Sequence, residues 1–207
     1  GIRCFVRYAF DNGLLPASTT PVTVETLAGI RSVTPIWERG AMVRASVDMG
    51  EPRLRADEIP VDLPGREVVL DYPIQVNGHR FAISCVSMGN PHAVAFVDEG
   101  FDDFPLGEIG PLVEHNPLFP DRVNFEIANV TSTELVKARV WERGSGLTEA
   151  CGSGACAIAV VARLHGYIGD EVDIDLPGGS LSVTWPGHGD VVLEGPVAHV
   201  FNGEWPD

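Results

Sequence analysis

The sequence predicts an α+β protein built from two similar halves. Short alternating or β-branched runs dominate the chain, and clusters of Gly, Pro, Asn and Asp separate them, as is typical of strands joined by turns. Two largely apolar segments, Gly1–Asn12 and Gly152–His165, favour helices instead. Because both segments are largely apolar, we expect both helices to be buried.

The expected strands follow one another along most of the chain. They cover residues 22–27, 43–49, 81–88, 92–99, 123–130, 135–142, 172–176, 181–185 and 190–201. Residues 63–67 (LPGRE) and 116–121 (NPLFPD) have the composition of loops.

An internal repeat supports the two-halves interpretation. When Gly1 is laid on Gly154, Gly13 falls on Gly166, and the hairpin-like segments that follow match without a gap at Val22/Val172, Gly29/Gly179, Ser32/Ser182, Val33/Val183 and Thr34/Thr184. Each copy consists of a helix, a glycine stop, a strand, a turn and a strand, which favours a duplication that gives two domains facing each other. We expect the first domain to comprise residues 1–47 with 196–207, and the second to comprise residues 48–195. The alternative is that buried helices and hairpins merely share a composition.

Composition excludes several classes of function. The net charge is −15, from 29 acidic and 14 basic residues without a Lys/Arg cluster, so nucleic acid is not an expected partner. No apolar stretch approaches the length of a membrane span, and we expect a soluble protein without a membrane partner. Four cysteines without a secretory signal suggest free thiols and a cytoplasmic location.

The most informative stretch is TEACGSGACAIAVVARLHG, which places Cys151 where the second helix begins. Unpaired N–H groups and the positive end of the helix dipole stabilise an anion there, so we expect a lowered thiol pKa and a reactive thiolate. The same N–H groups can hold a substrate carboxylate. Alternatives are a metal pair with Cys156 or a packed core cysteine. The flanking glycines favour the reactive thiol, and Cys4, Cys85 and Cys156 are expected in the core.

Three other motifs carry polar residues suited to catalysis. VWERGSG places Glu142 to exchange a proton with a thiol and Arg143 to pair with a carboxylate, although such a pair is also typical of a surface salt bridge. SMGNPHAVAFVDE places His92, an imidazole that titrates near neutrality, in a turn with Asn90. DRVNFEIANV places Asn124 at the start of a strand.

Taken together, GNPHAVAFVDE, RVNFEIANV and VWERGSGLTEACGSGACA, in this order and spacing, resemble the diaminopimelate epimerase family, and GIRCFVRY resembles its segment after the first catalytic cysteine. The resemblance implies two pseudo-symmetric α/β domains, each a mixed sheet or barrel around a central buried helix. It implies epimerisation of L,L- to meso-diaminopimelate by two cysteines, without cofactor or metal, for lysine and peptidoglycan precursors. Diaminopimelate would then be the small-molecule partner, and a homodimer is left open.

The same resemblance assigns roles to single residues. Cys151 would be the second catalytic cysteine, and His92 and Glu142 would adjust thiol protonation. The substrate-binding set would be Asn90, Asn124, Glu142, Arg143, Gly152 and Ser153.

The first catalytic cysteine of the family is expected upstream of Gly1, so this chain alone is expected not to epimerise. The alternatives are a proline or hydroxyproline racemase, and a non-catalytic remnant that only binds an amino acid.

Overall fold

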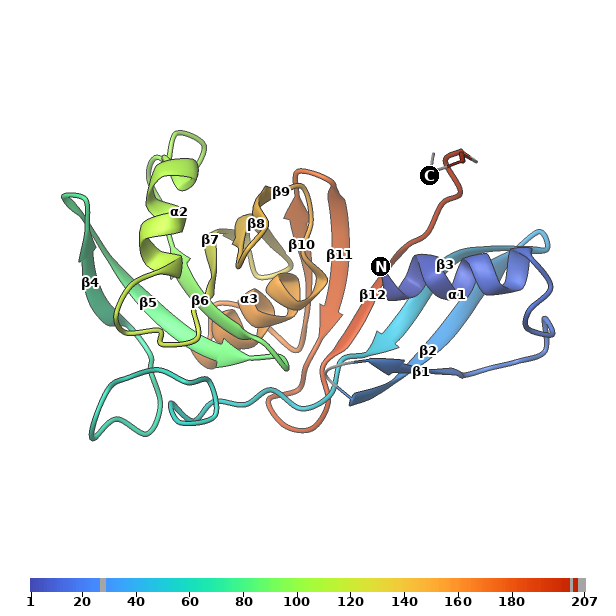
Figure 1. The fold of residues 1–207 in the computed structure, drawn as a ribbon, viewed down its shortest axis with the longest axis horizontal. Coiled ribbons are helices and arrows are strands. Elements are labelled where there is room, and N and C mark those ends of the chain that lie inside the picture. The colour runs from blue at the N-terminus through green and yellow to red at the C-terminus, as the bar shows by residue number, and fades with distance from the viewer. Residues whose placement is uncertain (27–28, 202, 205–207) are drawn as a thin grey trace. The chain divides into compact units, whose positions relative to one another are not determined.

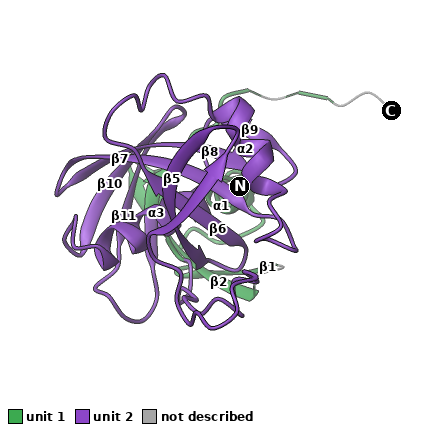
Figure 2. Cartoon of the chain, turned by 90° about the vertical axis from the view of Figure 1, so that its left-hand side faces the viewer, with its two compact units in different colours: residues 1–48, 194–207 green, residues 49–193 purple. Residues whose placement is uncertain are grey.

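The computed structural model describes residues 1–26, 29–201 and 203–204, and it divides into two compact units (Figures 1 and 2). Unit 1 consists of residues 1–48 and 194–207, and unit 2 consists of residues 49–193. The predicted α+β class is confirmed, with both units dominated by strands. Residue 27, the end of the first expected strand, lies outside the described residues.

Unit 1 contains one helix on a strand meander (Figure 1). The strands follow the order β1-β2-β3-β12, and β12 (Val192–Pro196) carries the chain from unit 2 back into unit 1. The other elements are α1 (Ile2–Asp11), β1 (Val22–Thr26), β2 (Gly29–Glu38) and β3 (Ala41–Asp48). The strand expected over residues 190–201 is therefore shorter than predicted, and after Pro196 a bond from Val197 N to Val43 O continues the pairing.

The prediction that the first helix is buried is wrong. Phe5 and Tyr8 of α1 are each 59% exposed, Cys4 is exposed rather than in the core, and the buried residues of the helix are Val6 and Ala9. The reason is that α1 packs against β2 and β3 along one face only.

Unit 2 wraps a mixed sheet around its central helix, α3 (Gly152–Leu164). The strand order is β11-β10-β8-β7-β6-β5-β4, with parallel pairs β6–β7 and β8–β10, and β9 pairs with β8. Strands β5, β6, β7, β10 and β11 all contact α3, so every residue from Gly154 to Ala162 is buried, as predicted. The described strands leave this path open, so the sheet does not close into a barrel. The strands are β4 (Tyr72–Val76), β5 (His79–Ser87), β6 (Pro91–Phe96), β7 (Asn124–Ser132), β8 (Leu135–Glu142), β9 (Gly146–Thr148), β10 (Glu171–Leu176) and β11 (Gly179–Thr184).

Helix α2 (Leu106–Glu114) and strands β4 and β9 were not predicted from the sequence. The local sequence does not indicate helix α2, because Gly107, Gly110 and Pro111 all lower helix propensity. Gly110 is required by packing: a Cβ there would lie 2.5 Å from Cγ of Trp141. Packing against the indole of Trp141, rather than local helix propensity, therefore determines that this segment is a helix.

The repeat seen in the sequence reappears in the hydrogen bonding. In unit 1 the β1–β2 hairpin pairs Val22 with Val33 and Thr26 with Gly29. In unit 2 the β10–β11 hairpin has the same register, with Val172 opposite Val183 and Leu176 opposite Gly179. The helix ends also match, since the N–H of Leu14 bonds to Ala9 O and that of Tyr167 to Ala162 O, each around a glycine of positive φ. The two units are thus built on one helix–hairpin plan.

Candidate functional site

All the site residues predicted from the sequence lie in unit 2, where strand ends and the start of α3 bring them together. Cys151 is the N-cap residue of α3, in an extended conformation with φ −131°. Its Sγ accepts a hydrogen bond from Gly154 N at 3.4 Å and lies 3.5 Å from Ser153 Oγ. The first N–H groups of a helix have no intrahelical acceptor, so those of Gly152 and Ser153 are oriented to bind an anion beside the thiol.

Close packing explains the glycines that flank the thiol. A Cβ on Gly152 would lie 3.2 Å from Leu193 Cδ2. A Cβ on Gly154 would lie 3.0 Å from Glu126 Oε1 and 3.4 Å from Cys151 Sγ. Gly154 therefore lets the start of the helix approach a buried carboxyl group, and Gly152 lets it approach Leu193.

His92 lies fully buried on β6, with a partner on each ring nitrogen. Its Nδ1 is 2.6 Å from Glu126 Oε1 on β7, and its Nε2 is 3.0 Å from Asn90 Oδ1. Glu126 is also fully buried and was not predicted as a site residue. The sequence signal that could have found it is an acidic residue between apolar Phe125 and Ile127, two positions after Asn124 and so on the same face of the strand.

Asn124 connects two segments of the backbone. Its Nδ2 donates to Pro91 O at 2.8 Å, and its Oδ1 accepts from Arg143 N at 2.9 Å. One amide hydrogen and one lone pair of this side chain remain for a ligand. The guanidinium of Arg143 donates to Asp121 O at 2.9 Å and is partly exposed.

The turn after β8 holds Glu142 and Arg143 in place. Glu142 Oε1 accepts from Thr148 Oγ1 at 2.5 Å. Glu114 at the end of α2 accepts from Trp141 Nε1 at 2.7 Å and from Gly144 N at 3.0 Å. Burial alone would raise the pKa of Glu114, but these hydrogen bonds and the nearby cations lower it overall, so the carboxylate stays ionised and fixes the turn.

The electrostatics of the thiol differ from the sequence-based expectation of a lowered pKa, which is wrong for this structure. Burial raises the pKa of Cys151 to about 11, and the carboxylates of Glu126 and Glu142 add to the effect. Hydrogen bonds from Ser153 and the Gly154 N–H oppose the shift but are outweighed. Cys151 is therefore a protonated thiol at neutral pH before a ligand binds.

The other three cysteines do not form a disulfide with Cys151. None of the four cysteines, all of which lie among the described residues, is in a disulfide, and Cys85 and Cys156 are buried in the core as predicted. No group of three or more His, Cys, Asp or Glu side chains in the described part of the chain has the geometry of a metal site. No helix within those same residues is long and apolar enough to cross a membrane.

Two other features of the structure could be considered as functional sites, but their side chains are less suited to catalysis or binding. Ser84 Oγ lies 3.1 Å from His165 Nε2, and His165 Nδ1 lies 3.6 Å from Asp71 Oδ2, which resembles a hydrolase triad. Ser84 is only 2% exposed and its oxygen accepts the Asp71 N–H, so it is not accessible to a substrate.

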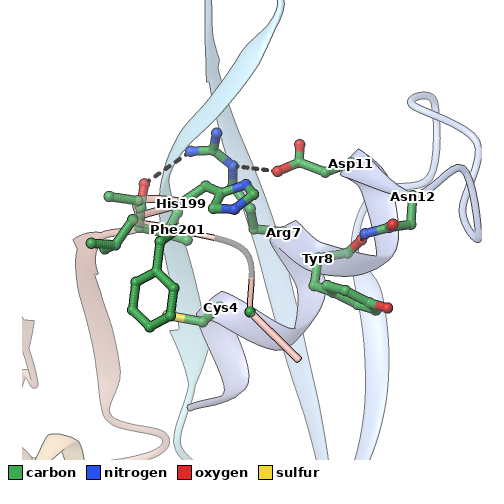
Figure 3. Close-up of a pocket in the computed structure, with 11 residues that line it drawn as sticks. Cys4, Arg7, Tyr8, Asp11, Asn12, His199 and Phe201 are labelled. Carbon is green, nitrogen blue, oxygen red and sulfur yellow. Dashed lines mark hydrogen bonds and ion pairs between the residues drawn. The ribbon is translucent and has the colours of Figure 1, made fainter. Parts of the chain in front are cut away.

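The second feature is a pocket of about 830 Å³ in unit 1, beside α1 (Figure 3). It contains none of the predicted site residues. Its Arg7 is already bonded to Asp11 and to the carbonyls of Met42 and Val197.

The fold is similar to that of solved proteins that include a probable proline racemase and a hydroxyproline epimerase. The chain matches a probable proline racemase from Agrobacterium radiobacter with a TM-score of 0.70 at 15% identity, covering 94% of this chain and 63% of that one. It matches a hydroxyproline epimerase from Agrobacterium vitis with a TM-score of 0.66 at 16% identity, covering 94% and 62%. The chain therefore spans less than two thirds of either solved structure, and at these identities the likeness concerns the fold alone.

The chain belongs to the diaminopimelate epimerase family. The family model for diaminopimelate epimerase matches residues 84–200. The chain is 45% identical to the diaminopimelate epimerase of Desulfovibrio desulfuricans, over 99% of this chain and 72% of that protein. It is 46% identical to the one of Moorella thermoacetica, over 100% of this chain and 73% of that protein. An amino-acid epimerase role follows for the protein, and the resemblance found in the sequence is confirmed.

Proposed function

We propose that this protein interconverts L,L- and meso-diaminopimelate by moving the α-proton between two thiols without a cofactor. The observation that carries the proposal is the placement of Cys151 at the start of α3, beside the N–H groups of Gly152 and Ser153. A carboxylate held by those N–H groups brings its α-carbon to the sulfur. In the reaction one thiolate takes the α-proton, and a thiol on the opposite face gives a proton to the resulting carbanion.

A raised thiol pKa is compatible with this chemistry. A bound substrate carries an α-ammonium group, and a cation close to the sulfur lowers the thiol pKa towards neutrality. His92 and Glu142 adjust the protonation of the thiols in this proposal. Exclusion of water and dipoles directed at the substrate carboxylate stabilise the carbanion in place of a cofactor.

The other end of the substrate is assigned to a set of polar side chains in unit 2. Arg143 pairs with the distal carboxylate, since a guanidinium matches carboxylate geometry. Asn90, together with the remaining amide hydrogen and lone pair of Asn124, forms hydrogen bonds with the distal ammonium and carboxylate. A site with groups for two amino-acid ends fits diaminopimelate better than it fits a cyclic imino acid. We therefore prefer diaminopimelate over proline or hydroxyproline as the substrate.

The partner thiol is not one of the other cysteines of this chain. Cys85 and Cys156 are closed off in the core, and the repeat lays Cys4 on Ala157 inside a helix rather than on Cys151. We therefore expect this 207-residue chain to exchange the α-proton on one face without completing epimerisation. The product would serve lysine and peptidoglycan precursor synthesis, and four free thiols fit a reducing cytoplasm.

The test is solvent-deuterium incorporation at the α-carbons of L,L- and meso-diaminopimelate, followed by NMR under reductant. We expect exchange with the wild-type chain and loss of at least about 100-fold in Cys151→Ala, because general acid–base groups contribute rate factors of that order. Cys4→Ala is the control and retains exchange, since Cys4 is an exposed thiol in unit 1.

The contrary results separate the alternatives. Exchange that survives in Cys151→Ala contradicts the thiol mechanism. Exchange with L-proline but not with diaminopimelate supports the proline-type racemase. Binding of diaminopimelate by calorimetry without any exchange supports the non-catalytic binding protein.

A further inference from the structure

A continuous chain of hydrogen bonds connects the thiol to a carboxyl group in the interior of unit 2. Cys151 Sγ lies 3.5 Å from Ser153 Oγ, which accepts from Asn90 Nδ2 at 3.4 Å. Asn90 Oδ1 lies 3.0 Å from His92 Nε2, and His92 Nδ1 lies 2.6 Å from Glu126 Oε1.

The donors in this chain point one way, towards the sulfur. Asn90 uses its NH₂ group on Ser153, so its oxygen is left to accept from His92, and Nε2 of His92 must carry a hydrogen. The hydroxyl of Ser153 is then free to donate to Cys151. This direction holds only while Nε2 is protonated, and Glu126 is the group bonded to the other ring nitrogen.

The surroundings of Glu126 favour a proton that stays within the His–Glu pair. Its Oε2 is buried and has no hydrogen-bond partner among the described residues, which is costly for an ionised carboxylate and less so for a neutral one. The groups that face it are His92 on β6, Cys85 on β5, Glu142 on β8 and Cys151 at the start of α3. Burial raises the pKa of Glu126, although His92 opposes the shift.

We propose that Glu126 is a positioning residue, which shares one proton with Nδ1 of His92 and so keeps Nε2 as the donor that begins the chain to Cys151. The proton is on Glu126 Oε1 when His92 is neutral, and on Nδ1 when the pair is carboxylate and imidazolium. In both forms Nε2 keeps its hydrogen. The assignment of His92 to catalysis rests on the proposed function, but the shared proton does not.

The first experiment is ¹⁵N NMR of the histidine rings and ¹³C NMR of the glutamate carboxyls in the whole chain, over a pH series. In the wild type we expect the ¹⁵N shift of His92 Nδ1 to lie between those of a protonated and an unprotonated ring nitrogen, because Nδ1 shares its proton with Glu126. In Glu126→Gln the amide donates to Nδ1 and no proton is shared, so we expect the Nδ1 signal of His92 to move to the shift of a fully unprotonated nitrogen while Nε2 remains N–H.

The control is Glu114→Gln, which removes another buried carboxylate of unit 2 and should leave the His92 signals unchanged. Identical His92 signals in Glu126→Gln and wild type would overturn the proposal. It would equally be overturned in the wild type, without any variant, by a His92 Nε2 that carries no hydrogen.

The second readout is the pH profile of α-proton exchange. We expect Glu126→Gln to shift or remove the inflection contributed by the shared proton, whereas a purely structural role would lower the rate equally at every pH. If no exchange occurs even in the wild type, the proposed function fails, while the NMR experiment still decides the role of Glu126.

Discussion

At the residue scale, burial outweighs the effect of the helix start on Cys151. Its sequence context predicts a lowered pKa, because helix N–H groups stabilise a thiolate. The structure leaves Cys151 only 7% exposed and places its thiol near Glu126 and Glu142. The free protein is therefore expected to hold this thiol protonated at neutral pH, and a protonated thiol is oxidised less readily than a thiolate.

The ultraviolet absorbance of the thiolate tests this directly. We expect the absorbance difference between the wild type and Cys151→Ala to appear with a midpoint of about 11 as the pH rises. A midpoint at or below about 8.5, the value of a free cysteine, would contradict the dominance of burial.

At the scale of a single element, helix α2 shows how packing overrides propensity. Two glycines and a proline argue against a helix over Leu106–Glu114, yet the segment folds as one because Gly110 lets Trp141 approach and Glu114 accepts the indole N–H. The helix in turn fixes the turn that carries Glu142 and Arg143.

Two substitutions on α2 separate the effect of packing from that of helix propensity. Gly110→Ala places a Cβ 2.5 Å from the rigid indole, and we expect it to lower the free energy of unfolding by about 1–3 kcal/mol. Gly107→Ala meets only Leu147 Cδ1 at 3.4 Å, an ordinary contact, so the gain in helix propensity should leave stability unchanged or raise it by up to about 1 kcal/mol. Urea denaturation measures both, and equal effects would contradict this account of the helix.

At the scale of the whole molecule, both units contain the same helix–hairpin arrangement, but the surroundings of the helix differ between them. The hairpins share a register and the helices share a glycine stop, but strands surround α3 whereas α1 has one covered face. The two apolar clusters of unit 2 are both formed within residues 49–193. Its stability should therefore come from its own core.

We accordingly expect a fragment of residues 49–193 to fold by itself. Circular dichroism should show one cooperative thermal transition, and the His92 signals in NMR should match those of the whole chain. A fragment without a cooperative transition would show that unit 2 depends on residues of unit 1.

Local signals in the sequence determined the α+β class, the buried second helix, the repeat and the position of Cys151, because strand alternation, apolar runs and glycine stops act over a few residues. They also identified the polar residues His92, Asn90, Asn124, Glu142 and Arg143. Only the tertiary structure decided that α1 is exposed, that α2 is a helix and that the pKa of Cys151 is raised, because each depends on atoms far away in the chain. Glu126 shows this best: its position in a strand is visible in the sequence, but its bond to His92 exists only where β6 and β7 lie side by side.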